Sequence, residues 1–566
     1  MFRFFIVLYL SFTFLHAAEP ILTRDARIHP VISQNGMVVC QDKLAAQVGL
    51  QILKDGGNAA DAAVATAYAL AVTLPKAGNI GGGGFALYYD AKNKKTVALD
   101  FREMAPAKAS EKIFQDKDGN VIKNKSRFTL QATGVPGTVS GLSTLLSSYG
   151  TMNNQKVLAP AIKLAEEGFP VSSALAYDLK SMSEVLQKNA AVKEIFYKNG
   201  QAYKEGELLK QKALANTLKR ISENGSSEFY EGETAKKLVD YFQNNDGLIS
   251  LEDLKKYKTL SAEPVKGTYR GYEVLAMPPP SSGGVHVIQM LNILEAWDIA
   301  KSGQNSAQTI HYMAEAMKLA YADRSKHMGD PRYSKLPIEG LISKKYAEVL
   351  RKSIKLDKAK PSSEIRPGSP AAYESPDTTH ISVTDKFGNV VSLTYTINFS
   401  FGSRIIIPEL GFFLNNEMDD FSAKPGVPNA FGLIGGSANK VEAGKRPLSS
   451  MTPLIMFKDK TPVLVTGSPG GSKIINSVMQ IIMNIVDHKQ NIAEATLAPR
   501  VHHQWLPDKL TIEQGISPDT IKLLKGMGHN VVQGGTIGCT ESIFIKGDYF
   551  YGFADTRRMD GFVSGY

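Results

Sequence analysis

The stretch ESPDTTHISVTD occupies residues 374–385 and separates two segments of different composition. The segment before it, residues 357–377, has four prolines, many polar residues and no apolar periodicity, which predicts an exposed loop. The segment after it alternates apolar and polar residues as a strand does. Thr378 and Thr379 therefore stand at a boundary between loop and strand. Because threonine is common in strands, the surrounding sequence must decide whether either hydroxyl is reactive.

The strand that begins at this boundary continues into a hairpin. Ile381 and Val383 fall on one face of the strand, and His380 falls on the opposite, polar face. The turn KFGN and the run VVSLTYTIN then complete an antiparallel pair of strands. We assign His380 and Thr379 to structural roles in this hairpin.

The rest of the chain predicts helices that pack on antiparallel sheets, an α+β fold. Residues 42–72 indicate two helices. Two glycines separate them, and Asn58 can cap the second. The glycine-rich GNIGGGG leads into a strand, and a charged turn returns through TVALDFRE. Residues 150–360 are mostly helical by periodicity, with TYRGYEVLAM as a strand. Two further strands, TPLIMFK and PVLVTGS, precede the helix KIINSVMQIIMNIVDH. No internal repeat and no linker divides the chain.

The N-terminus of the 566-residue chain resembles an export signal. Arg3 supplies a positive charge, residues 4–15 an apolar run, and Ala17 and Ala18 the small residues that a signal peptidase requires. The run is shorter than the ~20 apolar residues of a membrane-spanning helix. We therefore expect residues 1–18 to be removed and the mature protein to be periplasmic or secreted, with no stable membrane span. An uncleaved anchor is the alternative.

Charge and cysteine content exclude other classes of protein. The net charge is +10, but the lysines are interleaved with Asp and Glu, which predicts a mixed surface and no nucleic-acid partner. Cys40 and Cys539 form no metal-type spacing, and whether they pair is left open by the sequence.

Several catalytic classes lack their motifs. The chain has no Walker loop, no H-E-x-x-H and no G-x-S-x-G, and its GGGG run precedes a strand where a dinucleotide-binding motif would follow one. His502 and His503 lack carboxylate or cysteine companions, so we expect no metal site there. What remains is an exposed linker, a hairpin that starts with threonine, and several Gly-Gly and Ser-Ser pairs.

A threonine at a chain terminus can act as a nucleophile because its own α-amino group serves as the base. The pKa of an α-amino group, about 7.7–8.0, leaves part of it neutral near pH 7.5. The predicted loop before Thr378 is a place where the chain could be cut. Cleavage between Asp377 and Thr378 would create the nucleophile and its base in one step.

Many motifs along the chain resemble those of the bacterial γ-glutamyltranspeptidases, which belong to the N-terminal nucleophile hydrolases. These motifs are GGNAADAAVA (56–65), GNIGGGGF (78–85), LDFREMAP (99–106), PPPSSGG (278–284), YADRS (321–325), TTHISV (378–383), NNEMDDF (415–421), RPLSSMTP (446–453), GSPGGS (467–472) and the C-terminal DTRRMDG. The resemblance covers nearly the whole chain after the signal.

The resemblance implies a four-layer αββα sandwich formed jointly by two subunits from one precursor. The large subunit would comprise residues 19–377 and the small, catalytic subunit residues 378–566, paired as a heterodimer. Thr378 would attack the carbonyl of Asp377, and water would hydrolyse the resulting ester. The family commonly has an amide residue before the nucleophile, where this chain has Asp377.

The resemblance also implies how a γ-glutamyl group is held. Arg102 matches the family's arginine for the α-carboxylate, with Ser449 and Ser450 as hydroxyl donors to the same group. The predicted acceptors of the α-ammonium group are Asn398, Glu417 and Asp420.

Five further positions belong to the implied site. Gly470 and Gly471 match the backbone N–H groups that hold the oxyanion, and Thr396 matches a hydroxyl that supports the nucleophile. The lid residue would be Phe431, where a relative can carry tyrosine, and Lys473 stands where we expect arginine.

The resemblance implies cleavage of γ-glutamyl amides such as glutathione and glutamine through a γ-glutamyl-threonine ester. Water, an amino acid or a dipeptide would accept the group, and no metal or organic cofactor is implied. The alternatives are an acylase of the same fold that cleaves glutaryl side chains of β-lactam precursors, and a periplasmic solute-binding protein. The preferred donor, the balance of hydrolysis and transfer, and the higher oligomeric state are left open.

Overall fold

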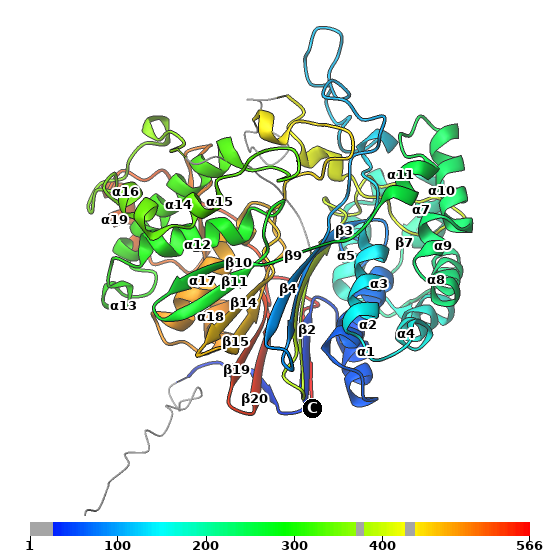
Figure 1. Cartoon of the computed structure of the whole chain (residues 1–566), viewed down its shortest axis with the longest axis horizontal. Helices are drawn as coiled ribbons and strands as arrows, with labels where there is room; N and C mark the ends of the chain where they lie inside the picture. Colours follow the sequence, from blue (N-terminus) through cyan, green and yellow to red (C-terminus); the bar gives the residue numbers. More distant parts are fainter. Residues whose placement is uncertain (1–25, 370–378, 425–435) are drawn as a thin grey trace, which may run out of the picture.

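Two antiparallel sheets lie face to face at the centre of the molecule, and helices cover both outer faces (Figure 1). The structure is a computed structural model that describes residues 26–369, 379–424 and 436–566. Each of the two sheets has seven strands. The layers therefore follow the order helix, sheet, sheet, helix, as the resemblance implies.

The first sheet contains the predicted hairpin. Its order is β21 (Phe562–Gly565), β2 (Gly36–Cys40), β12 (Thr379–Asp385), β13 (Val390–Thr396), β3 (Gly83–Asp90), β4 (Lys95–Phe101) and β9 (Leu260–Ala262). Ile381 pairs with Leu393 on one side and with Cys40 on the other. The hairpin thus forms the middle of a sheet whose other strands come from both ends of the chain.

The second sheet combines strands from before and after residue 378 in another arrangement. Its order is β1 (Val31–Ser33), β20 (Tyr549–Ala554), β19 (Glu541–Lys546), β15 (Thr461–Thr466), β14 (Leu454–Lys458), β11 (Tyr272–Ala276) and β10 (Val265–Tyr269). The single strand predicted at TYRGYEVLAM is wrong, because the chain turns back there. Arg270 (φ 48°) and Gly271 (φ 79°) make the turn between β10 and β11. The turn has only two residues, and tyrosines flank it on both sides, so the sequence resembles one continuous strand.

Helices α1 (Lys43–Lys54) and α2 (Ala59–Thr73) pack on the outer face of the first sheet. Asn58 caps α2 and forms a reciprocal capping box with Asp61, as its position predicted. Every residue of α2 is buried, because its alanines permit close packing on all sides. Ile381 and Val383 contribute to the same apolar cluster as α2. The alternation in the opening stretch therefore identified the face that meets the helices.

The other helices fall into two groups. Around α1 and α2 lie α3 (Thr138–Tyr149), α4 (Asn154–Glu167), α5 (Ser173–Ser181), α6 (Ser183–Leu186), α7 (Ala190–Phe196), α8 (Lys212–Asn224), α9 (Ser227–Tyr230), α10 (Glu233–Asn244) and α11 (Leu251–Lys256). The second sheet is covered by the group α12 (Gly283–Leu294), α13 (Ile299–Ser302), α14 (Ala307–His327), α15 (Ile338–Leu341), α16 (Lys344–Arg351), α17 (Lys473–Val486), α18 (Ile492–Leu497) and α19 (Pro518–Gly526).

The remaining elements are short. Three small sheets pair β5 (Phe169–Pro170) with β8 (Leu208–Leu209), β6 (Tyr197–Lys198) with β7 (Gln201–Ala202), and β17 (Leu510–Ile512) with β16 (Val501–His502) and β18 (Val531–Gln533). Single turns of 3₁₀-helix are formed by Leu130–Ala132, Ser362–Glu364, Glu417–Asp420 and Ser437–Asn439.

Polar side chains of β12 line the space between the two sheets. His380 Nδ1 lies 2.8 Å from the Thr394 hydroxyl, and Ser382 Oγ donates to the carbonyl oxygen of Glu541 at 2.8 Å. Burial lowers the pKa of His380 to about 3, so its ring is neutral. His380 thus sits on the inner face of its strand with hydroxyl partners, in agreement with the structural role we assigned.

The prediction of an exposed loop over residues 357–377 agrees with the part that the structure describes, because residues 357–369 form no strand or α-helix and seven of these thirteen residues are exposed. Ile365 is an exception, since it is buried, and the backbone N–H of Gly368 donates to Asp323 Oδ1 at 2.7 Å. Side chains of α14 therefore hold part of this segment in place. Composition alone does not reveal such partners. Residues 370–377 lie outside the described residues.

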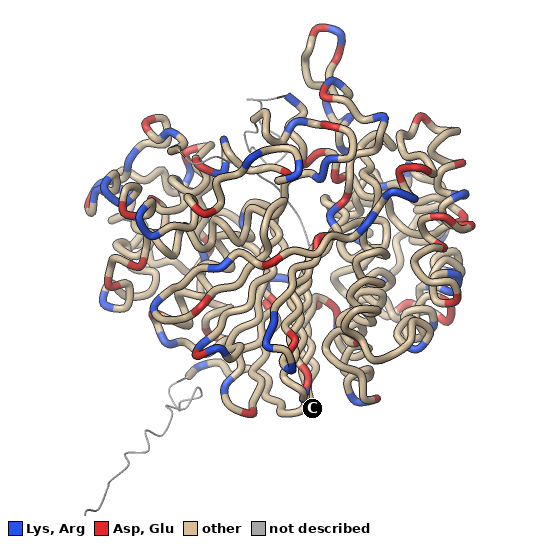
Figure 2. Tube along the Cα trace, in the orientation of Figure 1, with Lys and Arg blue, Asp and Glu red and all other residues tan. Residues whose placement is uncertain are grey.

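Surface charge and cysteines agree with the sequence. Lys and Arg residues are interspersed with Asp and Glu along the trace (Figure 2). Cys40 and Cys539 are both free and buried. Of the helices in the described part of the chain, none is long and apolar enough to cross a membrane.

Candidate active site

Strand ends from the first sheet bring several predicted residues to one edge. Thr379 begins β12 and pairs with Tyr395, the residue before Thr396 at the end of β13. Thr396 pairs in turn with Gly83, where β3 begins, and Arg102 directly follows β4. Because neighbouring strands are antiparallel, the start of β12 and the ends of β13 and β4 share this edge. Thr378, Asp377 and Phe431 lie outside the described residues.

Arg102 is the centre of a buried charged cluster. Its side chain is fully buried, and its Nη1 lies 2.5 Å from Glu417 Oε1 while its Nη2 pairs with Asp420. The same guanidinium donates to the backbone oxygens of Pro447 (3.2 Å) and Leu448 (3.0 Å). Burial alone would lower the pKa of Arg102, but the two carboxylates outweigh it and raise this pKa. The guanidinium therefore stays charged.

Glu103 adds a third carboxyl group to this cluster, and our sequence reasoning missed it. Its Oε2 lies 3.5 Å from Arg102 Nη1, and its side chain is fully buried. Burial, and next the charge of Glu417, raise the pKa of Glu103 well above its ordinary value. The neutral form of Glu103 is thereby favoured over the charged form in this cluster. Its position beside Arg102 in DFRE was the available signal.

Ser449 and Ser450 lie where RPLSSMTP crosses the PPPSSGG loop. The backbone oxygen of Ser449 accepts from both the N–H and the hydroxyl of Ser282, each at 2.7 Å. The Ser450 hydroxyl oxygen accepts from Arg324 Nη2. Arg324 Nε also donates to Ser282 Oγ at 2.9 Å. All four residues are buried, so this hydroxyl pair has a fixed position.

Asn398 lies in the left-handed region (φ 75°), which directs its side chain toward the 3₁₀ turn that carries Glu417. Its Nδ2 donates to the backbone oxygen of Asn416 at 2.9 Å, and its backbone N–H donates to Thr396 Oγ1 at 2.8 Å. Its buried Oδ1 has no hydrogen-bond partner among the described residues. An acceptor of this kind suits a ligand N–H donor.

Gly470 and Gly471 form the turn before α17. Their φ angles are 131° and 61°, a region that side-chain-bearing residues rarely adopt. A Cβ on Gly470 would also lie 3.0 Å from the Cα of Gly538. The turn therefore requires glycine at Gly470 for close backbone approach, which is what a backbone oxyanion site needs.

The comparison with known proteins agrees with this geometry. A family model described as Gamma-glutamyltranspeptidase matches residues 45–565. The chain belongs to this family. It is 54% identical over 540 residues to the glutathione hydrolase proenzyme of Escherichia coli strain K12, covering 95% of this chain and 93% of that protein. The family resemblance inferred from the motifs is thus confirmed.

Solved structures place this γ-glutamyltranspeptidase-family chain in the expected fold. Cephalosporin acylase from Bacillus halodurans superposes with a TM-score of 0.86 at 29% identity, covering 96% of this chain and 97% of that one. A chain of Helicobacter pylori γ-glutamyltranspeptidase gives a TM-score of 0.57 at 46% identity, covering 57% of this chain and 93% of that one. The N-terminal nucleophile hydrolase fold is therefore confirmed for this chain.

Two residues beside Thr379 were also missed in the sequence. The Thr379 hydroxyl donates to Gln41 Oε1 at 3.1 Å, and Arg558 Nη1 donates to the same oxygen at 3.1 Å. Gln41 thus links the first residue of β12 to Arg558. Gln41 lies 338 positions before Thr379, and Arg558 lies 517 positions after Gln41. No local sequence pattern could therefore reveal these contacts.

One group in the described part of the chain has the composition of a metal site. His311, Glu315 and His529 offer ligand atoms within 4.8 Å of one another. However, His311 Nδ1 lies 2.8 Å from His529 Nε2, as in a hydrogen bond, and Glu315 forms an ion pair with Lys318 at 2.5 Å. The ammonium group already takes the place of a cation, so we assign this cluster to structure.

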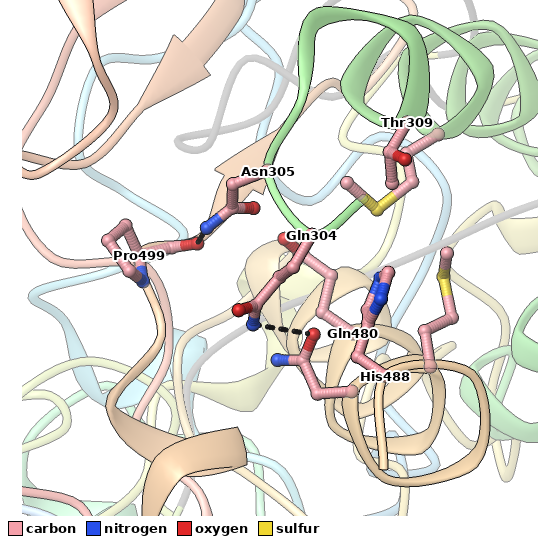
Figure 3. Close-up of a pocket in the computed structure, with 9 residues that line it drawn as sticks. Gln304, Asn305, Thr309, Gln480, His488 and Pro499 are labelled. Atoms are coloured by element: carbon pink, nitrogen blue, oxygen red, sulfur yellow. Dashed lines mark hydrogen bonds between the residues drawn. The ribbon is translucent and has the colours of Figure 1, made fainter. Parts of the chain in front are cut away.

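A small polar cavity lies beside the start of α14 (Figure 3). Its volume is about 10 Å³, which accommodates a single water molecule and no substrate. Asn305 Nδ2 donates to the backbone oxygen of Pro499 at 3.0 Å along its wall. None of the predicted site residues lines this cavity.

Proposed function

We propose that the chain is an exported, autoprocessed enzyme that cleaves γ-glutamyl amides and transfers the γ-glutamyl group. The observation that carries this proposal is the buried cluster of Arg102 with Glu417 and Asp420 at the strand edge where Thr379 begins β12. A γ-glutamyl group carries one α-carboxylate and one α-ammonium on the same carbon. A cluster with both signs of charge matches that pair, and the relatives named glutathione hydrolase proenzyme support the assignment.

The substrate would enter by exchanging partners with the cluster. Its α-carboxylate takes hydrogen bonds from Arg102, Ser449 and Ser450 in a bidentate or forked geometry. Its α-ammonium group replaces the guanidinium as the partner of Glu417 and Asp420. The unpaired Oδ1 of Asn398 accepts a further ammonium hydrogen. Both charges of the substrate are thereby compensated in a buried site.

The reaction then takes place at the γ-carbonyl carbon. The Thr378 hydroxyl attacks this carbon while its proton passes to the α-amino group of the same residue. The N–H groups of Gly470 and Gly471 hold the oxyanion, and the Thr396 hydroxyl supports the nucleophile. The C–N bond breaks as the proton moves to the leaving amine, which gives an ester. Water or an amine then attacks the ester, gives its proton to the α-amino group, and releases Thr378.

Processing would divide the chain into residues 19–377 and 378–566 after removal of residues 1–18. Strands from both parts alternate within each sheet, so the two subunits share both sheets. The β12–β13 hairpin of the small subunit, for example, lies between β2 and β3 of the large one. This arrangement supports a heterodimer that stays assembled after cleavage. Small-molecule γ-glutamyl donors and amino-acid or peptide acceptors would be its partners, and the site as proposed needs no cofactor.

The central test replaces Thr378 by Ala, with Thr379→Ala as the matched control. The wild-type protein should give two fragments on a denaturing gel and should release p-nitroaniline from γ-glutamyl-p-nitroanilide. Thr378→Ala should remain a single band of about 60 kDa without activity. Thr379→Ala loses one hydrogen bond and should still be cleaved. An uncleaved wild-type chain, or an active and cleaved Thr378→Ala variant, would overturn the proposal.

The likeness to a cephalosporin acylase favours one second candidate, an acylase for glutaryl amides. A glutaryl group keeps the carboxylate but lacks the α-ammonium. The buried acidic pair of Glu417 and Asp420 disfavours that substrate, because nothing on it would compensate these charges once Arg102 turns to the carboxylate. Glutaryl-p-nitroanilide should therefore be cleaved at least tenfold more slowly than its γ-glutamyl counterpart, roughly 1.4 kcal/mol. A preference for glutaryl would favour the acylase.

A further inference from the structure

The YADRS motif on α14 is a family signature to which the mechanism above gives no function. Its Arg324 is fully buried, and its guanidinium extends toward the two loops that carry Ser282 and Ser450. Helices α12 and α14 lie next to each other on the outer side of the second sheet (Figure 1). Arg324 therefore approaches the hydroxyl pair from behind, from the helix layer.

The direction of each hydrogen bond determines what the two serine hydroxyls can do. A hydroxyl has one hydrogen to donate and oxygen lone pairs to accept with. Arg324 Nη2 can only donate, so Ser450 Oγ must accept from it. The backbone N–H of Met451 likewise donates to Ser449 Oγ at 3.1 Å. Both oxygens thus accept from the protein, and both hydroxyl hydrogens are left to donate elsewhere.

Neither hydroxyl hydrogen has an acceptor among the described residues. The hydrogen bonds of Ser449 Oγ and Ser450 Oγ are the ones in which they accept. Both side chains are fully buried, so bulk water does not replace the missing acceptor. Two buried donors without an acceptor are suited to an anionic ligand. Arg324 additionally places a positive charge behind one of them.

The backbone of this pair is fixed by the same arginine. Ser282 Oγ accepts from Arg324 Nε at 2.9 Å and can then donate only to the Ser449 carbonyl, at 2.7 Å. The direction of each bond follows from the fact that a guanidinium has no acceptor. Arg324 therefore orients Ser450 directly and Ser449 through Ser282.

We propose that Arg324 is a positioning residue that fixes Ser449 and Ser450 as hydrogen-bond donors and thereby makes the site selective for substrates with an α-carboxylate. This inference rests on the proposed function, in which that carboxylate binds to Arg102 and the two serines. Arg324 acts through Ser450 and Ser282 and not by contact with the substrate. Its effect should therefore depend on whether the substrate has a carboxylate.

The test compares two substrates with the Arg324→Gln variant. γ-Glutamyl-p-nitroanilide has the α-carboxylate, and 4-aminobutyryl-p-nitroanilide lacks only that group. We expect kcat/KM for the first to fall about thirtyfold, because a charged hydrogen bond behind Ser450 is lost. We expect less than about a twofold change for the second. Lys326→Gln removes a charge from the exposed side of the same helix and should leave both values unchanged.

The variants are first brought to complete processing, so that only mature protein is compared. If Arg324→Gln does not yield folded, cleaved protein, Arg324→Lys takes its place, with an expected loss of about threefold on the carboxylate substrate alone. Combination with Ser450→Ala should add little to either single change, since both remove the same donor.

Each outcome separates the inference from the function on which it rests. Equal losses on both substrates, or no loss on the γ-glutamyl compound, would overturn the positioning role of Arg324. Failure of the wild-type protein to release p-nitroaniline from the γ-glutamyl compound would instead overturn the proposed function.

Discussion

The charged cluster and the hydroxyl pair are proposed to bind the same substrate carboxylate, but they differ in whether their hydrogen-bond donors are already occupied. Arg102 is already paired with Glu417 and Asp420, so its guanidinium must exchange partners before it can bind a substrate carboxylate. Ser450 accepts from Arg324 and keeps its hydrogen available, so the hydroxyl pair needs no rearrangement. The first region supplies charge selection, and the second supplies fixed geometry.

This difference teaches that burial affects the two regions unequally. Removal of a member of the charged cluster leaves an uncompensated charge in a medium that solvates it poorly. Removal of a neutral hydroxyl leaves at most an unsatisfied donor or acceptor. We therefore expect losses at the cluster to exceed losses at the hydroxyl pair, for stability as well as for activity.

The largest expected effect is that of Arg102→Gln. Two buried carboxylates would lose their cation, so we expect the free energy of unfolding to fall by about 3–5 kcal/mol. We expect kcat/KM for γ-glutamyl-p-nitroanilide to fall by roughly a thousandfold or more, because the charged contact to the α-carboxylate is lost and the scissile amide is no longer oriented. Urea denaturation and steady-state kinetics measure the two. Arg102→Lys keeps the charge, so its unfolding free energy and its kcat/KM should lie between those of Arg102→Gln and the wild type. Equal stability of Arg102→Gln and the wild type would contradict the larger effect that we expect at the charged cluster.

Acid should lower the stability of the fold. Burial lowers the pKa of His286, His380 and His502 to about 3 each, so the folded state binds fewer protons than the unfolded one between pH 6.5 and 3. Stability is then full above pH 6.5 and is lost as the pH falls. From pH 7 to pH 5, each such histidine should remove about 2 kcal/mol of unfolding free energy.

His380→Gln provides the check on this pH dependence. Urea denaturation at pH 7 and pH 5 should give a smaller difference for the variant than for the wild type, by about 2 kcal/mol. The variant can be less stable at pH 7, because hydrogen bonds to Thr394 and Ser382 change. An identical pH difference in both proteins would exclude His380 as a contributor.

The third effect concerns the ammonium side of the charged cluster. Asp420→Asn removes a negative charge that the proposed α-ammonium needs, whereas a glutaryl substrate has no such group. The ratio of kcat/KM for γ-glutamyl-p-nitroanilide over glutaryl-p-nitroanilide should fall about tenfold. Asp419→Asn is the matched control, since Asp419 contacts Ser126 and Arg127 and not Arg102. A ratio unchanged in Asp420→Asn would place the ammonium elsewhere.

The smallest expected effect is at the support of the hydroxyl pair. Ser282→Ala removes the hydroxyl between Arg324 and the Ser449 carbonyl, but the backbone N–H of Ser282 still donates to that carbonyl. We expect kcat/KM for γ-glutamyl-p-nitroanilide to fall about threefold. Ser281→Ala, whose hydroxyl bonds to the Met451 carbonyl, serves as the neighbouring control. A loss as large as that of Arg102→Gln would reverse the order of the two regions.

The charged cluster was predictable because its residues lie in recognisable motifs. Arg102, Glu417 and Asp420 were assigned through the resemblance of their motifs to the family, and the structure brings them together. The hairpin and the Asn58 cap were predictable for a similar reason, since alternation and capping are local patterns. The roles of all the site residues stay predictions, and Thr378, Asp377 and Phe431 also lie outside the described part of the chain.

The supports of the site were not predictable, because they depend on contacts over long sequence separations. Arg324 bonds to Ser450 across 126 positions, and Arg558 reaches Gln41 across 517. Glu103 was overlooked because its significance lies in burial, which raises its pKa and cannot be judged from DFRE alone. The contact between Gly368 and Asp323 of α14 was hidden for a similar reason, since it joins residues 45 positions apart.

The placement of β2 has a consequence for the order in which the molecule can assemble. This strand, among the first to be synthesised, is flanked by β12 and β21, which begin at residues 379 and 562. Until those strands arrive, β2 is an open template for hydrogen bonding with any other chain. Completion of the first sheet must therefore await the last strand of the polypeptide, which favours slow folding governed by long-range contacts. In a single precursor all seven strands stay covalently linked until the sheet is complete. Cleavage after that point would not separate strands that have yet to pair.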